Sequence, residues 1–142
     1  MGNYQFDKLF SLNEASELIP TLELLVRELQ ACVQTLRARL AELHGDNPAL
    51  EQMPLTAIVE RYPELKGTAT RMAAIAQEIE SHGCFLKDIE LGLVDFPWAI
   101  DDDNVVFLCW QSGEQAVAAW HPVEGGFTQR QPLPGVAKQY LN

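Results

Sequence analysis

Apolar residues recur at helical spacing through the first half of the chain. A capping box, Ser11-Leu-Asn-Glu14, marks the start, because its first and fourth side chains can each satisfy a backbone amide of a first helical turn. The apolar positions that follow form a heptad seam: Leu18, Leu22, Leu25, Leu29, Cys32, Leu36, Leu40 and Leu43. The pattern predicts one long helix that residues 44–48 end. Pro20 lies too deep for a first turn, so it either kinks or breaks this helix, and we expect a kink.

A second helical pattern follows at the same spacing, through Ile58, Tyr62, Leu65, Ala69, Met72, Ala76 and Ile79. Gly83 lies just past its end, where glycine commonly closes a helix. Pro54 and Pro63 leave its start open, and the continuous part is expected over Glu64–His82. Two such helices joined by a turn form an antiparallel, coiled-coil-like hairpin.

Beyond this helix the apolar pattern changes to a period of two, which is typical of strands. Four segments carry it, namely 92–96, 105–110, 116–121 and 127–131. Ser112-Gly113 is typical of the tip of a two-residue β-hairpin. Such a tip pairs Gln111 with Glu114 and, further along the ladder, Asn104 with His121.

Together these patterns predict an α+β fold: a long helical hairpin followed by a small antiparallel β-meander. At 142 residues we expect a single domain, 1–142. The hairpin is assigned to 11–82, the meander to 85–132 and a C-terminal tail to 133–142.

The chain is acidic, with 20 Asp and Glu against 10 Lys and Arg, for a formal net charge of −10. A nucleic-acid partner requires a basic surface stripe, so none is expected. The longest apolar run, Val105–Trp110, is far shorter than the roughly 20 residues of a membrane span. The N-terminus carries no apolar segment behind a basic one, so we expect a cytoplasmic protein without membrane association.

Cysteine spacing and catalytic motifs narrow the choice further. Cys32, Cys84 and Cys109 lie far apart and form no Cys-x-x-Cys pair, which indicates buried free thiols. Dinucleotide-binding, P-loop, serine-hydrolase and zinc-protease motifs are absent from the sequence, which excludes enzymes of those classes at the level of motifs.

The strand half holds the candidate ligand-binding residues: Asp88, Asp95, Trp110, Glu114, Trp120, His121 and Arg130. His121 and Asp95 are the candidate ligands of a divalent metal, because imidazole and carboxylate groups commonly bind such ions. A purely structural alternative has the His121 ring bonded to a backbone carbonyl and Asp95 paired with Arg130. The expected register separates Glu114 from His121 by about 23 Å of strand. We therefore expect Asp95, His121 and Arg130 to converge, with Glu114 apart from them.

Several short motifs occur together in order: Phe10-Ser-Leu-Asn-Glu-Ala15 with Pro20, Gly92-Leu-Val-Asp-Phe-Pro97, Cys109-Trp-Gln-Ser-Gly-Glu114, Trp120-His121, Gly126-Phe127 and Arg130-Gln-Pro132. Over nearly its whole length, the chain resembles the bacterial family called domain of unknown function 2203. The resemblance marks the same seven candidate positions and implies no activity, because the family has no established one. The chain departs from the family pattern at Pro122, where an acidic residue usually follows the histidine, and in a longer stretch over 44–62. The first departure weakens the case for a carboxylate beside His121.

Two functions fit these observations, and the sequence leaves open whether the protein is an enzyme. The first is a non-enzymatic binding or assembly module acting through its helical hairpin, either as a homodimer or with a partner helix. A dimer is favoured because Leu24, Ala31 and Val33 widen the apolar stripe of the first helix. The alternative is a small-ligand or metal site on the strand half, with hydrolytic chemistry as one form of it. An exposed helical stripe favours the first, and a pocket lined by Trp110, Trp120 and His121 favours the second.

Overall fold

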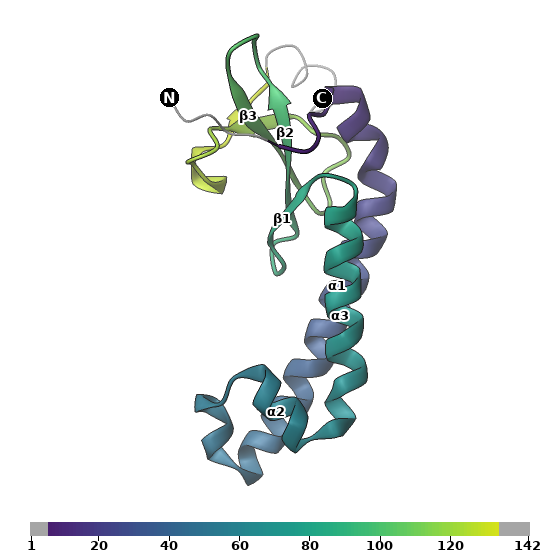
Figure 1. Ribbon diagram of the computed structural model, residues 1–142, viewed down its shortest axis with the longest axis vertical. Coiled ribbons are helices and arrows are strands. Elements are labelled where there is room, and N and C mark those ends of the chain that lie inside the picture. The colour runs from purple at the N-terminus through teal and green to yellow at the C-terminus, as the bar shows by residue number, and fades with distance from the viewer. Residues whose placement is uncertain (1–5, 134–142) are drawn as a thin grey trace.

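The computed structural model describes residues 6–133, in which a helical hairpin carries a five-stranded antiparallel sheet at one end (Figure 1). Helix α1 (Leu12–Asp46) and helix α3 (Lys66–Ser81) form the hairpin. The short helix α2 (Leu55–Arg61) lies at the end away from the sheet. The fold is α+β, as the sequence predicted.

Helix α1 begins and ends where local chemistry predicts. The Ser11 hydroxyl accepts from the Glu14 amide at 3.1 Å, and the Ser11 amide donates to the Glu14 carboxylate at 2.9 Å, so the capping box is complete. At the other end Asn47 caps the helix. The helix continues through Pro20 without interruption, so the alternative that this proline breaks the helix is wrong.

Two prolines divide the return arm of the hairpin. Pro54 caps the start of α2, and Pro63 opens a 3₁₀ turn, η2 (Pro63–Leu65). Another 3₁₀ turn, η1 (Pro48–Gln52), follows α1. Because proline cannot donate a helical hydrogen bond, the continuous helix starts only after η2, within two residues of the predicted start.

The hairpin packs through two separate apolar clusters. Near the sheet, α1 and α3 enclose a cluster that includes Leu22, Leu29 and Ile75, together with side chains of the sheet. The cluster at the far end packs α1 against the return arm through Leu36, Leu43, Leu50, Ile58 and Leu65. The predicted seam is thus buried or partly buried along its length, whereas Leu24 beside it is 73% exposed.

The sheet is a meander in which each strand pairs with the next. Its strands are β1 (Phe85–Asp88), β2 (Leu93–Ala99), β3 (Val105–Gln111), β4 (Ala119–His121) and β5 (Gln131–Pro132). The prediction of a strand over 127–131 is wrong for most of that range, because Phe127–Gln129 forms a 3₁₀ turn, η3. The third predicted segment, 116–121, is a strand only in its second half.

The predicted register between β3 and β4 is also wrong. His121 pairs with Phe107 rather than Asn104, a shift of three residues, because seven residues that join no ladder follow β3. Side chains hold this connection: the Trp110 indole donates to the Glu114 carbonyl at 2.9 Å, and the Gln111 amide donates to the Glu114 carboxylate at 2.7 Å. The tight turn predicted at Ser112-Gly113 is formed, since the Glu114 amide donates to the Gln111 carbonyl at 3.0 Å, but the ladder does not continue from it.

The strand pairing gives the sheet two different faces, since partners directly opposite each other point the same way. Val94 and Trp110 are one such pair, and they are buried against the helices. Asp95 and Cys109 are the next pair and point away from the helices, to what we call the outer face. Figure 1 shows the segment after β4 lying on the side of the sheet opposite the helices.

Three further expectations concern the chain as a whole. Within residues 6–133, none of the helices combines the length and apolar character needed to cross a membrane. Cys84 and Cys109 are buried and Cys32 is half-buried, and all three are free thiols. Of the predicted tail, 133–142, only Leu133 belongs to the described residues, and it is buried.

Candidate metal centre

Three buried side chains with metal-binding atoms meet on the outer face of the sheet. They come from adjacent strands: Asp95 from β2, Cys109 from β3 and His121 from β4. One ligand atom from each lies within 4.8 Å of the other two. The meander order brings them together, because neighbouring strands of a sheet are only about 4.8 Å apart.

Asp95 and His121 form a nearly inaccessible pair. The His121 Nε2 atom lies 2.9 Å from Asp95 Oδ2, and the two side chains are 4% and 3% exposed. On the other side of the ring, Nδ1 lies 2.7 Å from the Pro122 carbonyl oxygen. Because a carbonyl can only accept, Nδ1 carries a proton and donates it. The ring is therefore held with Nε2 facing Asp95 and Cys109.

Burial controls the protonation of the other two groups. Burial raises the pKa of Asp95. The charge and hydrogen bond of His121 and the charge of Lys87 lower this pKa and offset part of the increase. Burial also raises the pKa of the Cys109 thiol to about 12, and the neighbouring Asp95 charge acts in the same direction. Without a cation, the thiol is protonated at neutral pH. A divalent ion reverses this preference, because a thiol that coordinates it is deprotonated.

A cavity of about 80 Å³ opens beside these three side chains. The chain after β4 covers part of it with Gly125, Gly126 and Phe127, and β1 contributes Lys87. A water molecule takes up about 30 Å³ in the liquid, so the cavity has room for two or three waters or one small ligand.

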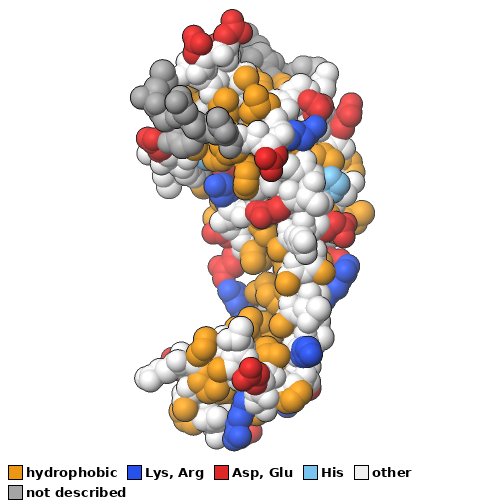
Figure 2. Space-filling model, in the orientation of Figure 1, with side chains coloured by type: hydrophobic (Ala, Val, Ile, Leu, Met, Phe, Trp, Pro, Cys, Tyr) orange, Lys and Arg blue, Asp and Glu red, His pale blue; other side chains and the backbone are white. Residues whose placement is uncertain are grey.

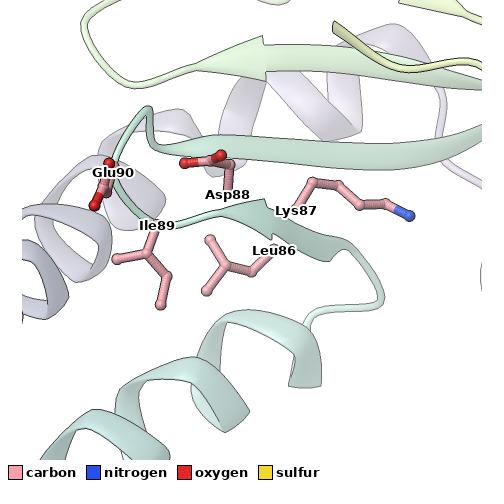
Figure 3. Close-up of a pocket in the computed structure, with 5 residues that line it drawn as sticks. All are labelled: Leu86, Lys87, Asp88, Ile89 and Glu90. Atoms are coloured by element: carbon pink, nitrogen blue, oxygen red, sulfur yellow. The ribbon is translucent and has the colours of Figure 1, made fainter. Parts of the chain in front are cut away.

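Lys87 reaches this cavity because it lies on the outer face of β1. Its side chain and that of Leu86 leave the strand in opposite directions, and Lys87 also points away from Ile89 (Figure 3). The ammonium group lies 4.7 Å from the centre of the Phe107 ring and 5.6 Å from that of Phe85. Two aromatic faces thus hold this cation next to the cavity.

Arg130 and Glu114 form a second polar pair beside the centre. The Arg130 guanidinium donates through Nη2 to both carboxylate oxygens of Glu114, one of them at 2.6 Å. The same nitrogen lies 3.5 Å from the Cys109 carbonyl oxygen. The expected pairing of Asp95 with Arg130 is therefore wrong, because Asp95 is paired with His121 and Glu114 takes the arginine.

The remaining candidates lie elsewhere. Trp110 is fully buried against the helices, and Trp120 is partly buried on the same face. Side chains alternate between faces along a strand, so the pocket lined by both tryptophans and His121, which would have favoured a small-ligand site, is not formed. Asp88 accepts from the Leu91 amide at 2.9 Å and closes the turn between β1 and β2.

Sequence reasoning missed Cys109 and Lys87 as members of this site. Cys109 was interpreted as a buried thiol, which it is, but its position opposite Asp95 was not foreseen. A usable signal was present: the turn over 100–104, with the alternation on either side of it, pairs Ala99 with Val105 and so Asp95 with Cys109.

A family model described as an uncharacterized conserved protein, DUF2203, matches residues 8–133. The match covers both the hairpin and the sheet, including the three side chains of the candidate metal centre. No curated protein and no solved structure matches the chain. The family match confirms the resemblance that the sequence motifs suggested, and the chain belongs to the DUF2203 family.

Proposed function

We propose that this protein binds a divalent transition-metal ion, with Zn²⁺ the best fit, through Asp95, Cys109 and His121. The observation that carries the proposal is that one ligand atom from each of these three buried residues lies within 4.8 Å of the other two. Four-coordinate zinc has ligand distances of about 2.0–2.3 Å, so its ligands lie on the order of 3.5 Å apart. Small side-chain movements are enough to bring the three atoms to that spacing.

The orientation of His121 supports the proposal. Histidines that bind metals usually donate their second ring N–H to a carboxylate or a backbone carbonyl, which fixes the other nitrogen as the ligand. Here the Pro122 carbonyl accepts from Nδ1 and leaves Nε2 facing the other two ligand atoms.

The chemistry of the ligands selects the class of ion. A thiolate and an imidazole suit zinc and its neighbours in the first transition series, while Mg²⁺ and Ca²⁺ prefer oxygen ligands throughout. With the carboxylate of Asp95 and the thiolate of Cys109, a divalent ion is electrically neutralised. This removes most of the cost of burying its charge.

The direct test is titration of chelator-treated protein with Co²⁺, which reports a cysteine ligand through thiolate-to-metal charge-transfer absorption. We expect one ion per chain, displaced by Zn²⁺. The variant Cys109→Ser should lose the charge-transfer band and bind at least about tenfold more weakly. The matched control Cys84→Ser, at another buried thiol, should behave as wild type. Substoichiometric binding, or an unchanged band in Cys109→Ser, would overturn the proposal.

Self-association through the helical hairpin is a second candidate, favoured by the 73% exposure of Leu24 in the first half of α1. Hydrophobic side chains also reach the surface along the hairpin between the sheet and α2 (Figure 2). We propose a homodimer, because an apolar stripe of this kind gains by covering itself with a second copy. Light scattering at high micromolar concentration tests this, and a 15.9 kDa mass would contradict it.

A further inference from the structure

We infer that the metal centre keeps an open coordination position and that this position takes a small carboxylate anion, held also by Lys87. The inference rests on the proposed function, since it concerns the same ion. It goes beyond that function by assigning the class of ligand that the centre recognises.

The number of protein ligands is the first argument. Among residues 6–133, the cluster that can hold an ion contains three ligand-bearing side chains, Asp95, Cys109 and His121. Structural zinc sites are closed by four protein ligands, whereas sites with three leave a position for an exchangeable ligand. All three of these side chains also line the cavity of about 80 Å³, so the open position has space in front of it.

Charge is the second argument. The ion with one carboxylate and one thiolate is neutral, so the sign of the cavity depends on the other groups around it. Arg130 is neutralised by Glu114. Lys87 instead lies over two aromatic rings, and within the described part of the chain it has no carboxylate at salt-bridge distance. The cavity therefore carries one uncompensated positive charge, which favours a monoanion over a neutral ligand.

Size is the third argument. A cavity of this volume accommodates about two or three water molecules, which is close to the size of a carboxylate group with at most one carbon attached. One carboxylate oxygen can coordinate the ion while the other accepts from the ammonium of Lys87. This pairing of a metal with a cation distinguishes a carboxylate from an alcohol or an amide of equal size.

The test uses the Co²⁺-loaded protein, whose visible absorption responds to a change in coordination, and titrates it with acetate. We expect a saturable spectral change with acetate and none with acetamide, which has the same size and no charge. In Lys87→Met the acetate affinity should fall by about tenfold, the worth of one charge-assisted hydrogen bond, while the thiolate-to-Co²⁺ charge-transfer band is retained. Lys66→Met is the matched control, because this exposed lysine lies at the far end of α3 from the sheet.

The outcomes separate the two proposals. If Co²⁺ binds with its charge-transfer band and acetate changes nothing, the centre is closed and only this inference fails. This inference alone also fails if acetamide acts like acetate, or if Lys87→Met binds acetate as wild type does, because the open position then does not select a carboxylate through Lys87. If Co²⁺ itself does not bind, the proposed function fails and this inference fails with it.

Discussion

The buried pair of Asp95 and His121 should show a strong energetic coupling in the metal-free protein. If both groups are ionised, their attraction at 2.9 Å and an effective dielectric constant of about 20 is about 6 kcal/mol. Taking both groups out of water offsets much of this, and their side chains are only 3% and 4% exposed. We expect a net coupling of about 1.5–3 kcal/mol, the range of hydrogen bonds that involve a charged group.

The assay is a double-mutant cycle on Asp95→Ala, His121→Ala and the double variant. Urea unfolding is followed by far-ultraviolet circular dichroism, with a chelator present so that no metal contributes. The same cycle on Arg71 and Glu28 serves as the control, since this ion pair joins α3 to α1 with side chains 50% and 44% exposed. Solvent screening should make the control coupling much smaller. A coupling below about 0.5 kcal/mol for the buried pair, or one no larger than the control, would refute the reasoning.

Three further predictions concern the packing of the helices, the thiols, and the pair of Glu114 and Arg130. Leu24→Asp should leave the fold intact and, if the hairpins dimerise, give a monomer by light scattering. Leu29→Asp instead buries an unpaired charge at a position that is 1% exposed, and it should unfold the hairpin, which circular dichroism would show. At pH 8 an alkylating reagent should modify half-buried Cys32 and spare Cys84, because burial raises the pKa of Cys84 to about 12. For the same reason the free energy of unfolding should fall as pH rises from about 9, because the Cys84 thiol ionises in the unfolded chain at a lower pH than in the folded one. Glu114→Gln should lower the free energy of unfolding by about 1–2 kcal/mol in urea, since its arginine partner loses a charged acceptor, and an unchanged midpoint would show that this pair contributes nothing.

The helical half could be predicted closely because its signals are local. The capping box at Ser11, the stop at Asn47 and the two helix-breaking prolines each act within one or two turns of backbone. The heptad spacing then identified which positions are buried, because a helix places residues three and four apart on one side. None of these inferences required knowledge of a distant partner.

The strand half was predicted only in part. The central strands β2 and β3 emerged from alternation, while η3 occupies most of a segment that alternates in sequence. The predicted register between β3 and β4 failed because it continued the ladder directly from the turn at Ser112-Gly113, and the sequence pattern does not show that the side chains of Trp110 and Glu114 hold a longer connection. Loop conformations that depend on such side-chain hydrogen bonds have no periodic signature.

The sequence by itself thus determined the two-part architecture, the helix ends and the candidate residues Asp95 and His121. Only the tertiary structure decided their partners: it paired these two with each other, added Cys109 and Lys87, and gave Arg130 to Glu114. The physical reason is that strand pairing joins residues far apart in sequence, and a shift in register changes every cross-strand neighbour. Helical periodicity is set by neighbouring residues, whereas a site built across three strands exists only once their register is fixed.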